Sequence, residues 1–111
     1  MNQVSVDRST CGVTKTMKII GAKWTMLILR DLFEGPKRFG QLQRSLVGIS
    51  PKTLSLRLDE LERDGLVSKQ VFAEVPPRVE YRLTDKGQSL HQIIDDMRSW
   101  GEYQLDVAVN S

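Results

Sequence analysis

Cysteine and histidine are almost absent from this sequence, with one of each in 111 residues. A single cysteine excludes an intramolecular disulfide, and one cysteine with one histidine is too few for a zinc site of the usual Cys/His composition. The chain also lacks an apolar stretch long enough to cross a membrane, a secretory signal and a glycine-rich phosphate-binding loop. These absences predict a cytoplasmic protein that binds no membrane, metal or cofactor.

Groups that could perform catalysis are equally scarce. The only histidine, His91, stands beside apolar residues near the C-terminus, and no residue close to it in the sequence makes a nucleophile–base pair with it. An active site needs several titratable groups that act together. We therefore expect that the protein is not an enzyme.

Acidic residues are missing from one long segment. The net charge is only +2, but positions 35 to 58 contain no Asp or Glu and five basic residues. The tail from Asp95 onward has the opposite balance, with four acids and one base. A basic stripe of this kind is the electrostatic footprint of a nucleic-acid-binding protein, although an ordinary solvated face can have the same composition.

The length suits one domain over residues 1–111, and the 40% hydrophobic content is enough for one modest core. Residues 1–9 are polar and are expected to be loose. The apolar positions in residues 10–20 predict a short helix that Ser9 or Thr10 caps. The segment from Trp24 to Phe33 is apolar on nearly every side, which predicts a central, buried helix.

The next two helices are short, and a turn that contains glycine joins them. Apolar spacing predicts the first of them over Phe39, Leu42 and Leu46. The second begins at Ser50 and Pro51, a capping hydroxyl followed by a residue that needs no backbone donor. Three leucines at helical spacing give this helix one buried face: Leu54, Leu58 and Leu61. Gly65 ends the helix. Two helices in this arrangement form a helix-turn-helix.

The hydrophobic period then changes from helical to alternating. Val79, Tyr81 and Leu83 alternate with charged residues, which predicts a strand with one face inward. Residues 67–75 and 78–84 flank two prolines and are predicted to form a two-stranded hairpin, the wing. The fold class is therefore α+β and mostly helical, with a winged helix-turn-helix in residues 38–84.

A final helix is predicted over residues 85–109, with Thr84 as its cap. Its apolar stripe exceeds what one small domain needs, so we expect an exposed face that pairs with a second copy about a two-fold axis. The helices over 10–20 and 85–109 would then be dimerisation helices. The expected interface residues are Val13, Met17, Leu90, Ile94, Met97 and Trp100.

Double-stranded DNA is the partner that the basic region fits. A helix can enter the major groove, where residues near its N-terminus reach the base edges, while a cap and free amides favour a phosphate. Residues of the preceding helix would lie toward the DNA backbone, and an arginine at the wing tip could enter the minor groove. The expected contacts, in chain order, are Arg38, Gln41, Arg44, Ser50, Lys52, Thr53, Ser55, Leu56, Arg57 and Arg78.

Some of these arginines have alternative partners inside the protein. Arg38 or Arg57 can pair with an acid farther along the second helix, and Arg78 can pair with an acid of the hairpin. The acids in question are Glu60, Asp64, Glu74 and Glu80. The function has alternatives as well: a winged helix that binds protein, with an incidental basic stripe, or a nonspecific DNA-binding protein.

Four segments carry a more specific pattern: IGAKWTMLIL, RFGQLQRSLVGISPKTLSLRLDELERDGLV, VFAEVPPRVEYRLTDKG and SWG. In combination they resemble the HxlR-type transcriptional regulators, which are MarR-like, over about residues 11–101. The resemblance implies a homodimeric winged-helix protein that acts as a repressor or an activator. Two copies would place their recognition helices about one DNA turn apart on a pseudo-palindromic operator.

The resemblance also gives Cys11 a role to test. Several members of the family sense electrophiles or oxidants through a cysteine near the N-terminus, and Cys11 falls at that position. The first turn of a helix, with Lys15 one turn on, can make a thiol reactive. The family often has proline after this cysteine, whereas Gly12 stands here. The implied effector is a small electrophile, an oxidant or another small ligand near the dimer helices.

Leu56 departs from the family as well. The related proteins often have a polar residue at this position, commonly glutamine, which can form hydrogen bonds with a base. A leucine has no donor or acceptor and can only contact an apolar surface, such as the methyl group of thymine.

Overall fold

The structure is a computed structural model that describes residues 11–106, and its elements follow the order expected of a winged helix. The helices are α1 (Gly12–Ile20), α2 (Lys23–Leu32), α3 (Phe39–Ser45), α4 (Pro51–Arg63), α5 (Asp85–Gln88) and α6 (His91–Trp100), followed by the π-helix η2 (Gly101–Asp106). The strands are β1 (Lys37–Arg38), β2 (Val67–Phe72) and β3 (Arg78–Leu83). The predicted fold class, α+β and mostly helical, is confirmed.

Helix α2 lies at the centre of the packing, as its apolar sequence predicted. It contacts α1, α3, α4, α6 and β3, and its residues Ile28, Leu29 and Leu32 are buried. The three predicted leucines of α4 are also buried in this core. Removing a leucine side chain from water contributes about 1.5–3 kcal/mol. These contacts fix the position of α4 relative to the rest of the chain.

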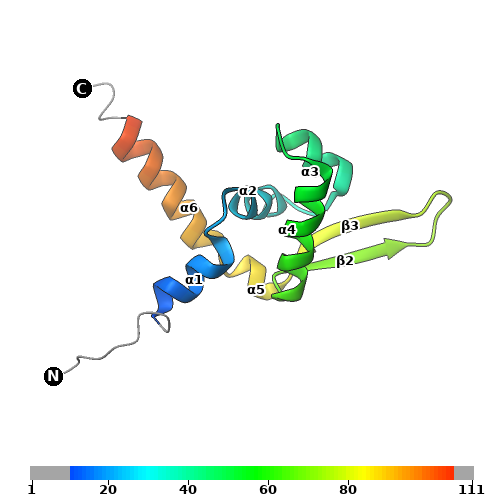
Figure 1. Cartoon of the computed structure of the whole chain (residues 1–111), viewed down its shortest axis with the longest axis horizontal. Helices are drawn as coiled ribbons and strands as arrows, with labels where there is room; N and C mark the ends of the chain where they lie inside the picture. Colours follow the sequence, from blue (N-terminus) through cyan, green and yellow to red (C-terminus); the bar gives the residue numbers. More distant parts are fainter. Residues whose placement is uncertain (1–10, 107–111) are drawn as a thin grey trace.

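The wing is an antiparallel hairpin of β2 and β3, paired from Val67 opposite Leu83 to Phe72 opposite Arg78. It projects away from the helices (Figure 1). The short strand β1 pairs with β3 on its other edge, so the sheet has three strands in the order β1-β3-β2. The sequence did not predict β1, because a strand of two residues has no periodicity. It also placed the end of the first wing strand at residue 75, whereas β2 ends at Phe72.

The end of α4 agrees with the predicted boundary. Gly65 has φ +78°, in the left-handed region that favours glycine. Its backbone N–H donates to the carbonyl oxygen of Glu62 at 3.0 Å. The chain leaves the helix here and enters β2 two residues later.

The C-terminal segment differs from the single helix that was predicted over 85–109. Thr84 caps α5 as expected, since its hydroxyl oxygen accepts the Gly87 N–H at 3.1 Å. Gly87 is buried, and a Cβ at this position would overlap the carbonyl oxygen of Leu66. After this close approach the chain turns at Ser89 and Leu90, and α6 then extends on the side opposite the wing (Figure 1). The loose segment 1–9, the caps Ser9 and Thr10, and residues 107–109 lie outside the described residues.

Candidate nucleic-acid interface

Ser50 caps the N-terminus of α4, as the sequence predicted. The Ser50 hydroxyl oxygen accepts the Thr53 N–H at 3.1 Å, and the Ser50 hydroxyl donates to the Thr53 hydroxyl oxygen at 2.9 Å. Pro51 is the first residue of the helix. The hydroxyl proton of Ser50 is therefore already donated to Thr53, within the first turn of the helix. Pro51 has no N–H, and the Leu54 N–H donates to the Ser50 carbonyl oxygen at 3.0 Å. The Lys52 N–H is therefore the backbone donor of the first turn that stays available to an anion.

The exposed face of α4 is largely polar. Lys52, Ser55 and Leu56 are exposed on its N-terminal half, and the exposed fraction of Leu56 is 50%. The side chains of Lys52 and Ser55 form no hydrogen bond or ion pair with any residue from 11 to 106. Asp59 and Arg63 are exposed farther along the helix. The sequence reasoning missed Arg63, although its spacing of seven residues from Leu56 places it on the same face.

Arg57 lies on the flank of α4 and is only partly exposed. Its guanidinium Nη1 donates to Glu60 Oε1 at 2.9 Å, and its buried Nε has no partner among the described residues. The side chain lines a hollow of about 140 Å³ with Lys18, Thr25 and Asp64, between α4 and the α1–α2 junction. The structure thus contains the intramolecular pair that the sequence left open, and a base contact by Arg57 stays a prediction.

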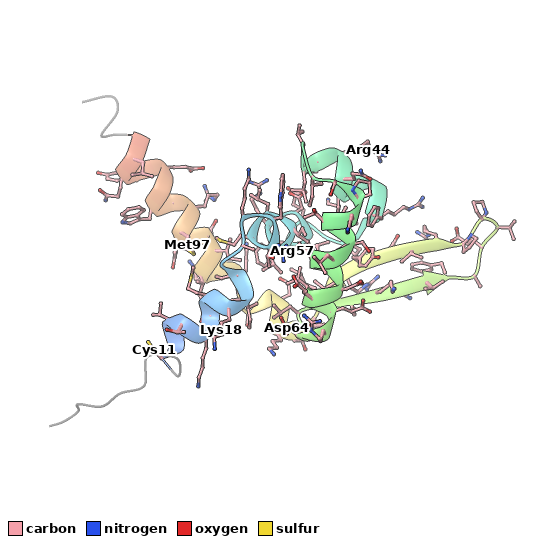
Figure 2. All side chains as sticks on the ribbon, viewed as in Figure 1. Cys11, Lys18, Arg44, Arg57, Asp64 and Met97 are labelled. Carbon is pink, nitrogen blue, oxygen red and sulfur yellow. The ribbon has the colours of Figure 1, made fainter. Side chains whose placement is uncertain are left out.

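Two arginines without ion pairs lie at the ends of α3: Arg38, the last residue of β1, immediately precedes the helix, and Arg44 lies in its last turn. The Arg38 N–H donates to Gln41 Oε1 at 2.8 Å, so the Gln41 side chain caps the helix rather than standing free. The side chains of Arg38 and Arg44 are exposed, and neither forms an ion pair within the described part of the chain; Figure 2 shows Arg44 on α3. These two guanidinium groups and the Lys52 ammonium are therefore unpaired cations on, or directly beside, the two helices of the helix-turn-helix.

Arg78 is held inside the wing instead of extending from its tip. Its Nη2 is 2.9 Å from Glu74 Oε2 and its Nη1 is 2.8 Å from Glu80 Oε2. The guanidinium also lies over the Phe72 ring, 3.9 Å from the centroid. Both carboxylates that the sequence offered as alternative partners are engaged. Insertion of Arg78 into a minor groove, which stays a prediction, would require the loss of both ion pairs.

At the base of the wing, Tyr81 packs against the core. Burial raises the pKa of its hydroxyl, and the positive charge of nearby Lys69 opposes this shift. The hydroxyl is therefore uncharged at neutral pH. Tyr81 itself therefore adds no negative charge beside α4.

The predicted dimer stripe divides into two faces. Ile94 is 6% exposed and belongs to the core, and Leu90 packs partly against the core. The prediction that Ile94 faces a partner is therefore wrong, because Ile94 lies on the side of α6 that packs on α2. Leu90 precedes α6 and keeps part of its surface open, so its place in a dimer interface stays a prediction. The exposed apolar side chains of α1, α6 and η2 are Val13, Met17, Ile93, Met97, Trp100, Tyr103 and Leu105.

Cys11 precedes the first residue of α1 and is exposed. It lies at the outer end of α1, on the side of the molecule away from the wing (Figure 2). A hollow of about 350 Å³ separates α1 from α6 and is lined by Val13, Met17, Ile93 and Met97, among others. The exposed thiol and the exposed apolar side chains therefore lie on the same side of the molecule.

Residues 11–106 contain no cluster of three or more His, Cys, Asp or Glu side chains that could hold a metal ion. Within the same residues, no helix has both the length and the apolar character needed to cross a membrane.

Comparison with known proteins assigns this arrangement to a family. The family model described as HxlR-like helix-turn-helix matches residues 19–108. The HTH-type transcriptional regulators YdeP and YkvN of Bacillus subtilis (strain 168) are 42% and 44% identical to the chain; the matches cover 92% and 91% of it and 80% and 86% of those proteins.

Solved structures agree with this assignment. The reduced form of the redox regulator HypR has a TM-score of 0.84 and 39% identity, with 91% of this chain and 100% of that chain covered. The reduced form of the transcriptional regulator YodB from B. subtilis has a TM-score of 0.74 and 36% identity, over 84% of this chain and 92% of that one. The exposed α4, its unpaired neighbouring cations and these similarities lead to one assignment. The chain belongs to the HxlR-like helix-turn-helix family of transcriptional regulators.

Proposed function

We propose that the protein is a cytoplasmic, dimeric regulator that binds a pseudo-palindromic DNA operator in a sequence-specific way and has no enzymatic activity. The observation that carries the proposal is the exposed N-terminal half of α4, which is anchored by buried leucines and flanked by the unpaired Arg38 and Arg44. A rigid helix with exposed donors fits the major groove, and nearby unpaired cations fit the phosphates.

Dimerisation is supported by the apolar surface of α1, α6 and η2. Met97 and Trp100 are exposed on α6, and Val13 and Met17 are exposed on α1 beside it. Large apolar side chains that gather on one side of a small protein mark an interface more often than a free surface. A second copy would cover this side and leave α4 and the wing of both copies free for two half-sites.

A competition gel-shift assay tests this function. We expect that the protein binds duplex DNA from its own upstream region, or a sequence selected from a random library, in the presence of excess random duplex. Loss of the complex on competition would reduce the function to nonspecific DNA binding. No complex with any duplex at low salt would favour a winged helix that binds protein.

Release of Arg57 should strengthen DNA binding. In Glu60→Gln the guanidinium of Arg57 loses its charged partner, which lies 2.9 Å away, and becomes available for a phosphate. We expect about three- to tenfold tighter binding at low salt, with a salt dependence steeper by about 0.9 in the log–log slope. Affinity measured across a salt series checks both values.

The matched control is Glu62→Gln, which removes the same charge from α4. Glu62 forms no ion pair within the described residues. If only the loss of negative charge mattered, the two variants would bind DNA with equal affinity. That result would show that Arg57 does not reach the DNA once it is released.

We also propose that Cys11 makes the regulator responsive to oxidants or electrophiles. An exposed thiol at the start of α1, on the same side as the apolar surface, supports this response. The similarity to the redox regulator HypR supports it as well. With one cysteine in each chain, oxidation can join Cys11 to the same residue of a second copy or to a small thiol. Two thiols lose two protons and two electrons to the oxidant as one S–S bond forms.

Diamide should therefore change operator affinity in the native protein but not in Cys11→Ser. The change is expected because a bond at the end of α1 constrains the helices of the dimer surface. Non-reducing electrophoresis would identify the S–S product, and dithiothreitol should reverse both effects. A response of the same size in Cys11→Ser would assign the sensing to another group.

A further inference from the structure

We infer that Leu56 reads the methyl group of a thymine in each half-site of the operator, and so determines part of the sequence specificity. The inference rests on the proposed function, because it names the base that one position of the same DNA-binding face selects. It begins from the surface of α4 and from the contacts that its neighbouring side chains already make.

Leu56 is the one large apolar side chain exposed on α4. The other leucines of the helix are buried in the core, whereas half of the Leu56 surface is open. Its exposed neighbours on the N-terminal half of α4 are Pro51, the first residue of the helix, and the polar residues Lys52 and Ser55. The exposed apolar side chains of α1, α6 and η2 belong to other elements, so Leu56 is not part of that apolar surface.

Two other polar side chains of this half of α4 already form contacts within the protein. The Thr53 hydroxyl accepts from Ser50 at 2.9 Å, and the Arg57 guanidinium is paired with Glu60 at 2.9 Å. Lys52, Ser55 and Leu56 are exposed and, among residues 11–106, have no side-chain partner. Lys52 and Leu56 are four residues apart and share one face of the helix. A helix that enters a groove by this face places Leu56 against the base edges.

The chemistry of the major groove then selects the base. Each of the four bases presents hydrogen-bonding groups there, but thymine alone also presents a methyl group, at C5. A leucine pressed against a donor or acceptor would exclude water from that group without replacing the lost hydrogen bond. Against the thymine methyl, both surfaces are apolar and contact removes both from water.

The position of the thymine relative to Lys52 follows from the helix geometry. Lys52 and Leu56 are four residues apart, which is one turn, or about 6 Å along the helix. Successive base pairs are about 3.4 Å apart. The thymine should therefore lie within one or two base pairs of the base or phosphate that Lys52 contacts.

The test is a scan with deoxyuridine, which lacks only the methyl group. Each thymine of the bound operator is replaced in turn, and the affinity of the intact protein is measured by titration. Loss of one buried methyl contact should weaken binding about fourfold in one half-site, and about 15-fold when both half-sites are changed. Thymines outside the α4 footprint should show no effect on replacement.

Leu56→Ala assigns the effect to this side chain. The variant should bind the thymine operator more weakly and should bind the thymine and deoxyuridine operators equally. Val71→Ala is the matched control, since Val71 is an exposed aliphatic residue on the wing; it should keep the full deoxyuridine penalty. Leu56→Gln should shift the preferred base from thymine toward adenine, with which glutamine can form two hydrogen bonds.

Two results would overturn the inference while specific DNA binding persists. One is an operator in which no deoxyuridine replacement lowers the affinity, and the other is a deoxyuridine penalty that is undiminished in Leu56→Ala. Failure of the proposed function gives a different result. No complex with any duplex would then persist in the presence of competitor DNA, so there would be no operator on which to carry out the scan.

Discussion

Replacing Met97 by aspartate should convert the proposed dimer into a monomer and weaken operator binding by about 100-fold or more. Met97 is 43% exposed on α6 and lines the hollow between α6 and α1, so a second copy that covers this side must bury it. A buried carboxylate without a partner is strongly unfavourable. A monomer holds one half-site only and loses the gain in affinity that comes from linking two binding events.

Sedimentation or light scattering gives the oligomeric state, and titration of the operator gives the affinity. The matched control is Val75→Asp, which places the same charge on a fully exposed valine between the wing strands. That variant should remain dimeric. A dimer that persists in Met97→Asp would place the interface elsewhere and would remove the support that the α1–α6 surface gives to the proposal.

The second large effect is expected in the core beneath the DNA-binding face. Leu58→Ala should lower the free energy of unfolding by about 3–5 kcal/mol, because it opens a cavity where packing is complete. Leu58 has 0% exposure and packs in the core that contains α2. Thermal or denaturant unfolding at a fixed protein concentration measures the change, since coupled dimerisation makes the midpoint depend on concentration.

Leu56→Ala provides the control on the same helix, two residues away. Leu56 is half exposed, so its truncation should change the free energy of unfolding by less than about 0.5 kcal/mol while it weakens operator binding. Equal losses of stability in the two variants would mean that Leu56 packs inward. That outcome would also contradict its contact with a base.

The elements of this fold were largely predictable because local signals coincide with the boundaries. Ser50 and Pro51 mark the start of α4, Gly65 marks its end, and the alternation around Tyr81 marks β3. The short strand β1 was not predictable, since its two residues become a strand only by pairing with β3. The break after α5 depends on the contact between Gly87 and Leu66, which are far apart in the sequence.

The candidate site was predictable in its location but less so in its individual contacts. A sequence shows that Arg57 stands three residues before Glu60, but it does not decide between an ion pair with this acid and a contact with DNA. Arg78 has two acids within reach, and the structure contains ion pairs with both. On α6, apolar residues at steps of three and four can lie on either of two neighbouring faces of the helix. Only the packing against α2 shows that Ile94 points toward the core.

The contacts of α2 have a consequence for how such a protein can be switched. The helix contacts α1, α6 and α4, so its packing connects the end of the molecule that carries Cys11 with the end that carries Leu56. In a symmetric pair, a small rotation of α2 in both copies would alter the separation of the two recognition helices. DNA fixes the required separation at about 34 Å, or a multiple of it. A change of a few ångströms would put both helices out of register with their grooves, without any rearrangement within α4 itself.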